Sequence, residues 1–370
     1  MTVPPPPNQW GPQPPTGGQP MDPPHWGSTR WGSPPGPPPS SGGKGKWIFG
    51  GIALLAVIAV TIVITVMVVG KDSGGGESPT PTSGNGSDFA SANDKGPANI
   101  ITEDPTCEAW GRIAREFSAQ EDSVSWANRD TAAAASAWSP EQRNMYDTVA
   151  KAMNSAADQT VNLVKLTPHR VMRELYEQFI AYGQAFNSRI PTYTVNDDDL
   201  AVVTDTVGTA LASICSAIDY RSAQPLAPLV SQPDSPTQLS VPGDPGHPDR
   251  FLTTSDNVCS DLDSLVAKFS ADTAAWRALD PAIPAKDWSP EQKTVNDSVA
   301  PVMTTYANDL EQLGRRSNNP VLQDFAVLAA QYQRAFAKAL PTYTAADSYL
   351  SEAAVYLVRT LRWGCKAAGV

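Results

Sequence analysis

The chain carries one stretch of sequence twice. Residues 126–220 align with residues 276–370 without a gap, at a constant offset of 150 residues and with 28 identities. The matching blocks include a Trp-Ser-Pro-Glu-Gln motif that begins at Trp138 and Trp288, and a Pro-Thr-Tyr-Thr motif. Because each copy is expected to fold in the same way, this duplication constrains most of the chain, and a length of 370 residues accommodates two such units.

Four segments in each copy have apolar residues at helical spacing, and their boundaries carry helix start signals. The second segment begins at Ser139 with a capping box followed by proline, and copy two repeats the motif at Ser289. The third is predicted to start after Thr167 in copy one and two positions later, after Asn319, in copy two. The fourth follows Thr194, which has an acid three residues on.

Four amphipathic helices joined by short connections favour an up-down-up-down bundle, in which the start of the first helix and the end of the fourth share one end. That geometry brings Cys107 beside Cys215, and Cys259 beside Cys365. Four cysteines allow three pairings, and this one closes each copy on itself. The sequence therefore predicts an all-α fold with two homologous, disulfide-closed four-helix bundles, which we expect to behave as separate domains.

A membrane span is predicted over residues 47–70, which contain no charged residue. As a helix they would extend ~36 Å, enough to cross a hydrocarbon core of ~30 Å. Arg30, Lys44 and Lys46 precede the span, which indicates a cytoplasmic N-terminus. A cleaved signal peptide is the alternative, but 46 residues precede the span. We therefore predict a single-pass signal anchor in the cell membrane, with all four cysteines on the extracytoplasmic, oxidising side.

Composition sets the remaining boundaries. Residues 1–46 are rich in Pro and Gly and predict a disordered cytoplasmic tail. Residues 71–100 predict a flexible Gly/Ser/Thr stalk, whose Ser-Pro-Thr-Pro-Thr segment is also compatible with O-glycosylation. The helical copies then occupy residues 101–220 and 251–370, and a Pro-rich linker, 221–250, joins them.

No catalytic or metal-binding constellation is recognisable in the sequence. Of three histidines only His169 lies in a copy, and copy two has Asn319 at that position. The acidic run 196–199 lacks EF-hand spacing, and acids at a helix N-terminus explain it better than calcium binding. The sequence therefore predicts no enzymatic activity, no cofactor and no metal.

Aromatic residues stand at equivalent helix entries in both copies, namely Trp138 and Tyr193 in the first and Trp288 and Tyr343 in the second. Packing on the first helical turn is the favoured interpretation, and a ligand-binding groove is the alternative. The residue at the fourth helical position is Arg143 in copy one, so we expect its cationic stem to stack on the indole.

Charge restricts the class of partner. The net charge is −11, and the acidic excess lies beyond the predicted span, so the chain has no electrostatic footprint for nucleic acid. In the tail, Trp10, Trp26 and Trp31 each precede a glycine among the prolines. Such segments dock on aromatic-lined grooves, which indicates a cytoplasmic partner, although an inert spacer has the same composition.

A tail rich in Pro, Gly and Trp, a Gly-Lys-Gly-Lys-Trp-Ile run at 43–48, one span and a stalk resemble the conserved proline-rich membrane proteins of mycobacteria and related actinobacteria. The resemblance covers residues 1–100 and implies a cell-envelope protein of a group often without an assigned function. The leading hypothesis is a membrane-anchored module that binds or scaffolds an envelope protein or a small ligand. An envelope enzyme acting on wall or lipid substrates and a transmembrane sensor are the alternatives.

Overall fold

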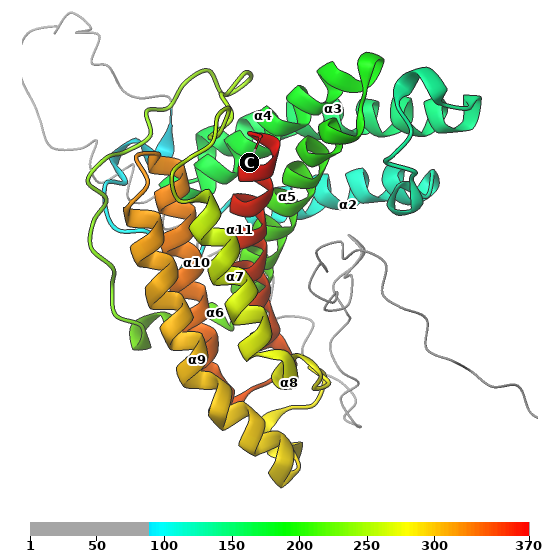
Figure 1. Cartoon of the computed structure of the whole chain (residues 1–370). Coiled ribbons are helices and arrows are strands. Elements are labelled where there is room, and N and C mark those ends of the chain that lie inside the picture. Colours follow the sequence, from blue (N-terminus) through cyan, green and yellow to red (C-terminus); the bar gives the residue numbers. More distant parts are fainter. Residues whose placement is uncertain (1–88, 370) are drawn as a thin grey trace, which may run out of the picture. The chain divides into compact units, whose positions relative to one another are not determined.

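A computed structural model of the protein describes residues 89–369. This part contains ten α-helices and several short 3-10 helices, and it has no β-strand (Figure 1). The prediction of an all-α fold is therefore confirmed for these residues. The predicted tail 1–46, the predicted span 47–70 and residues 71–88 of the predicted stalk lie outside the described residues.

Copy one is built on four long helices: α2 (Cys107–Ser123), α3 (Pro140–Leu166), α4 (Arg170–Arg189) and α5 (Asp198–Asp219). Helix α2 contacts α3 and α5, and α4 contacts α3 and α5. Each helix contributes apolar side chains to a shared core, among them Trp110, Val149, Phe179 and Val207. Hydrophobic burial along one stripe of each helix thus holds the four together.

Copy two repeats this arrangement with α7 (Cys259–Asp272), α9 (Pro290–Arg315), α10 (Pro320–Ala339) and α11 (Ser348–Ala367). Helix α9 contacts α7 and α10, and α11 contacts α7 and α10. Two short helices, α6 (Ala223–Leu226) and α8 (Ala274–Arg277), lie in the connections. The order of helix contacts is therefore the same in both copies.

Capping at the second helix is confirmed in both copies. The Ser139 hydroxyl accepts from the Gln142 amide, and the Gln142 side chain accepts from the Ser139 amide. Ser289 forms the same box in copy two. Thr194 also forms a box, but a 3-10 turn, Val195–Asp197, intervenes before α5 begins.

The predicted two-residue stagger between the third helices is wrong. Helix α4 begins at Arg170 and α10 at Pro320, which are equivalent positions. The Thr167 hydroxyl is engaged by the Asp104 carboxylate, so it does not cap α4, and His169 becomes the N-cap residue. A tertiary hydrogen bond thus displaces the local capping signal.

The two copies pack against each other, mainly through α5 and α11 (Figure 1). At this contact the rings of Tyr220 and Tyr349 stack with centroids 5.1 Å apart. All described residues belong to one compact unit. We had expected separate domains, and this expectation is not met, because α5 is apolar around most of its circumference and needs a second covering surface.

Each copy also holds the segment that leads into the other copy. The Tyr332 hydroxyl on α10 lies 3.3 Å from the Ile101 nitrogen and 3.4 Å from its carbonyl oxygen. The Tyr182 hydroxyl on α4 donates to the Leu252 carbonyl over 3.2 Å. Residues 89–100, which we had assigned to the stalk, take part in this packing, because Ile100 is buried in the core.

The linker 221–250 is fastened to both copies. The Gln224 side chain donates to the Thr102 carbonyl, and Arg315 donates to the Asp234 carbonyl. Further along, Gln184 on α4 donates to the Gly246 carbonyl. The linker therefore follows the surface of the folded unit.

Among the described helices, one is long and apolar enough to span a membrane, Val195–Asp219. Two thirds of its apolar window, 67%, is buried inside the protein, and Cys215 within it forms a disulfide. The core helix of a folded domain has the same length and composition.

Candidate functional site at the contact between the copies

Each disulfide joins the start of a first helix to the end of a fourth. Cys107 pairs with Cys215 and Cys259 with Cys365, with Cα atoms 5.3 and 5.7 Å apart. This is the pairing that the helix order predicts, and the described part of the chain holds no free cysteine. The two bonds close the two copies separately.

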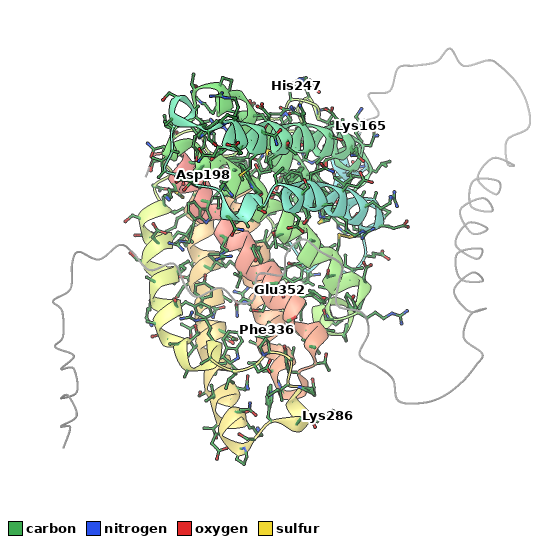
Figure 2. All side chains as sticks on the ribbon, turned by 90° about the vertical axis from the view of Figure 1, so that its right-hand side faces the viewer. Lys165, Asp198, His247, Lys286, Phe336 and Glu352 are labelled. Carbon is green, nitrogen blue, oxygen red and sulfur yellow. A yellow bond between two sulfur atoms is a disulfide. The ribbon has the colours of Figure 1, made fainter. Side chains whose placement is uncertain are left out.

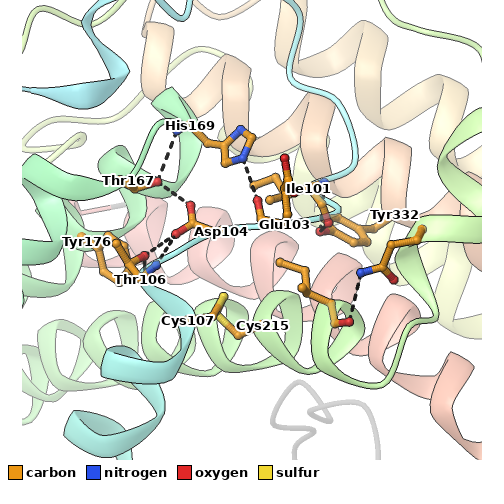
Figure 3. The surroundings of a disulfide bond; sticks show 12 residues. Ile101, Glu103, Asp104, Thr106, Cys107, Thr167, His169, Tyr176, Cys215 and Tyr332 are labelled. Carbon is orange, nitrogen blue, oxygen red and sulfur yellow. Dashed lines mark hydrogen bonds between the residues drawn. A yellow bond between two sulfur atoms is a disulfide. The ribbon is translucent and has the colours of Figure 1, made fainter. Parts of the chain in front are cut away.

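A buried polar network surrounds the first disulfide (Figure 3). The Asp104 carboxylate accepts hydrogen bonds from the hydroxyls of Thr106 and Thr167, and Thr106 also lies 2.8 Å from the Tyr176 hydroxyl. Burial raises the pKa of Tyr176. His169, expected to face solvent, is exposed, and its Nε2 lies 2.8 Å from the Glu103 carbonyl oxygen. The network ties the leading segment of copy one to α4.

The aromatic residues repeated in both copies hold the loop before the second helix. The Trp138 indole donates to the Ala133 carbonyl, and the Tyr193 hydroxyl donates to the Thr131 carbonyl. Trp138 is only 8% exposed and Tyr193 only 1%, and Trp138 stacks on Tyr146 at 3.9 Å. These side chains are packed in the core and therefore do not line an open groove.

The same bonds recur in copy two. The Trp288 indole donates to the Ile283 carbonyl, and the Tyr343 hydroxyl donates to the Pro281 carbonyl. The expected stacking of a cationic stem is present in copy one, where the Arg143 guanidinium lies 5.9 Å from the Trp138 ring centre. Duplication of these residues thus reflects a shared way of building the loop.

A buried ionic network joins the two copies, and our sequence reasoning missed it. The Arg170 guanidinium on α4 donates two hydrogen bonds to the Asp324 carboxylate on α10, over 2.8 and 3.0 Å. Arg170 also donates to the backbone carbonyls of Asp94 and Gly96 in the leading segment. This bidentate pair is buried on both sides, so it is screened far less than a surface pair.

Glu174 lies within this network and is fully buried. Its Oε1 accepts a hydrogen bond from the Ser240 hydroxyl of the linker and lies 3.5 Å from the Arg173 guanidinium. Its Oε2 has no hydrogen-bond partner within residues 89–369. Burial and the nearby Asp324 carboxylate raise the pKa of Glu174 well above its usual range, against the opposing effect of Ser240 and the two arginines.

The charges of the network belong mostly to copy one. On α4 they recur at helical spacing, as Arg170, Arg173, Glu174 and Glu177, whereas copy two has Pro320, Gln323, Asp324 and Val327 at these positions. This stripe in an otherwise apolar helix was the available signal, but such a stripe is normally a solvated face. Only the packing of the second copy over α4 makes it buried.

Two cavities lie beside the linker. One of about 260 Å³ is lined by Glu177 and Ser240 of the network, together with His247, Arg250 and Phe251. The other, of about 620 Å³, lies between residues 229–234 and the helices α9 and α10. Within residues 89–369 no group of three or more His, Cys, Asp or Glu side chains is arranged to hold a metal ion.

Copy one contains a second ionic cluster, around Arg129. This guanidinium pairs with Asp198 over 2.9 Å and lies over the Trp126 ring at 4.0 Å. Burial and neighbouring carboxylates raise the pKa of Glu121 to about 9, and burial raises the pKa of Asp205 to about 7. Copy two has Leu279, Ser348 and Val355 in place of Arg129, Asp198 and Asp205. The copies have therefore diverged most in their buried charges.

Comparisons with known proteins give one family and one close relative. A family model described as mycobacterial ESX-1 associated protein matches residues 89–369. An uncharacterized protein of Mycolicibacterium smegmatis (strain MKD8) is 46% identical over 338 residues, which is 90% of this chain and 89% of the relative. No solved structure matches the chain.

Proposed function

Because this chain belongs to the family of mycobacterial ESX-1 associated proteins, we propose that it serves ESX-1 as a non-enzymatic binding or scaffolding protein of the cell envelope. The single observation that carries the proposal is the use made of the duplicated residues. Trp138 and Tyr193, repeated as Trp288 and Tyr343, hold backbone in both copies and line no cavity. Selection on such a pair of units favours a stable surface over a reaction centre.

In this proposal the module consists of two homologous, disulfide-closed four-helix bundles. The equivalent order of helix contacts, the equivalent capping boxes and one disulfide in each copy support it. The linker and the α5–α11 contact combine the bundles into one body that presents a composite surface. A partner would then contact both copies at once.

We also propose that residues 47–70 anchor this module in the membrane and that the module lies on the extracytoplasmic side. The uncharged run, the basic residues before it and the two disulfides support this topology. Protease treatment of intact cells tests it, because it should remove the module. Survival of the module until the cells are lysed would contradict the proposal.

Crosslinking in cells tests the partner. A photoreactive residue is placed at Lys338 or Thr304, which line the 620 Å³ cavity beside the linker, and at the exposed Glu116 on α2 as a control. We expect Lys338 or Thr304 to capture a protein of the ESX-1 machinery, and the adduct to disappear from cells that lack ESX-1. Adducts that persist unchanged without ESX-1 would contradict the proposed association.

A further inference from the structure

The last part of the linker crosses the contact between the copies as a strap, which we define as residues 236–249. It begins beyond Asp234, whose carbonyl is held by Arg315, and it ends at the buried Phe251. Phe251 contacts both copies, because its amide donates to Gln178 on α4 and its carbonyl accepts from Asn319 before α10. Both ends of the strap are therefore fixed to the body of the protein.

Between these ends the strap has little to hold it. None of its residues is buried, and Val241 is 88% exposed. Its described hydrogen bonds to the helices come from Gln178, which donates to the Asp249 carbonyl, from Gln184, and from the Glu174 network through Ser240. A segment with few apolar contacts opens at a low free energy, so the state of one anchoring group can decide whether it is closed.

We propose that Glu174 and Ser240 form a pH-sensitive latch, which keeps the strap closed over the copy contact while Glu174 carries a proton and releases it when Glu174 ionises.

The charge balance of the buried groups supports this latch. Arg170 is neutralised by Asp324, and Arg173 donates to Glu177 over 3.0 Å. With both arginines paired, an ionised Glu174 would be an uncompensated negative charge close to Asp324. A protonated Glu174 leaves the network neutral, which is the arrangement that a buried site tolerates.

Every other charged group near Glu174 has been considered. Asp94 in the leading segment lies 3.8 Å from the Arg170 guanidinium, but its side chain is 30% exposed and adds a further negative charge. On the strap, Asp244 is paired with His247 at the surface, and Asp249 is also exposed. None of these groups supplies a buried cation for an ionised Glu174. The pKa of Glu174 is raised, so the closed strap is favoured at low pH and loses its stabilisation as the pH rises through that pKa.

Opening the strap relieves the buried charge. Ser240 and the adjoining strap residues line the 260 Å³ cavity that Glu177 also borders. Once the strap lifts, water reaches this cavity and the α4 face that carries Glu174 and Glu177. The ionised carboxylate is then hydrated, and a surface spanning α4 and the start of α10 becomes accessible.

Hydrogen exchange of the full-length protein tests the latch. We expect the protection of strap amides in the wild type, corrected for intrinsic exchange, to fall between pH 5 and pH 10, by about tenfold for each pH unit above the Glu174 pKa. In Glu174→Gln the strap should stay protected across this range. Glu352→Gln, at a buried glutamate on α11 far from the strap in sequence, is the matched control and should keep the wild-type dependence.

Ser240→Ala provides a second test that leaves Glu174 in place. We expect its strap to exchange faster than the wild-type strap at pH 5, while amides of α4 and α10 keep their protection. Strap protection that is flat from pH 5 to pH 10 in the wild type would overturn the proposal. An identical pH dependence in the wild type and Glu174→Gln would also overturn it.

Discussion

The hydroxyl of Tyr182 donates a hydrogen bond to the backbone carbonyl of Leu252, across the boundary between the two copies. Tyr332, at the equivalent position of copy two, bonds the backbone of Ile101 in copy one. Both rings are fully buried. The two copies thus clasp each other by their leading segments in an approximately reciprocal way, and neither copy completes its own core.

Removing either hydroxyl should weaken both copies together. We expect Tyr332→Phe and Tyr182→Phe each to lower the free energy of unfolding by about 1 kcal/mol, because a buried backbone group loses its partner. Urea unfolding followed by circular dichroism measures the loss. Tyr356→Phe, on a partly exposed tyrosine of α11, is the control and should change stability less. Two separate unfolding transitions in the variants would contradict the clasp.

Breaking the ion pair between the copies should have a larger effect. We expect Asp324→Asn to destabilise the protein by about 3–5 kcal/mol, because it leaves the Arg170 guanidinium buried with a weaker partner. The double variant Arg170→Met with Asp324→Leu should recover much of this loss, since no charge is then buried alone. Equal stability of the single and double variants would show that the pair makes no net contribution.

Each disulfide should stabilise the chain by a similar amount. The bonds span 108 and 106 residues, for which the chain-entropy model gives about 4–5 kcal/mol each. We expect Cys107→Ser with Cys215→Ser to lower stability in the same range as Cys259→Ser with Cys365→Ser, as measured by chemical unfolding. Because the copies form one compact unit, both variants should still unfold in a single transition. Loss of structure in only one copy would contradict this expectation.

Stability should also depend on Glu352, which lies on α11 (Figure 2). Burial raises its pKa to about 7, while a hydrogen bond from Ser213 on α5 opposes the shift. The folded-state pKa is raised, so ionisation of Glu352 destabilises the fold as the pH rises from about 5 to about 8, by at most about 3 kcal/mol. We expect Glu352→Gln to have a higher Tm than the wild type at pH 8 and a similar Tm at pH 5. Glu116→Gln, at an exposed position, should show no such difference.

Local signals in the sequence predicted local structure well. The capping box at Ser139 involves residues three positions apart, and its geometry does not depend on the rest of the fold. The cysteine pairing followed from the helix order alone. Thr167 shows where this reasoning ends, because its hydroxyl had a tertiary partner, Asp104, that no local pattern indicates.

The contact between the copies was beyond such reasoning. Residues on several faces of α5, such as Ala201, Val203, Val207 and Ala210, are buried, so the helix is covered on more sides than its own bundle provides. An apolar helix of this kind indicates extra burial but does not name the surface that covers it. The charged stripe of α4 could not be recognised as buried for the same reason.

The leading segment has a mechanical consequence. A pull applied at Phe89 in the direction of residue 1 is transmitted first to Arg170 on α4, which grips Asp94 and Gly96, and to Tyr332 on α10. Tension along the chain is thus shared between the two halves of the protein before it reaches the first disulfide. The load-bearing element is a backbone clamp, and its failure would precede the unravelling of either bundle.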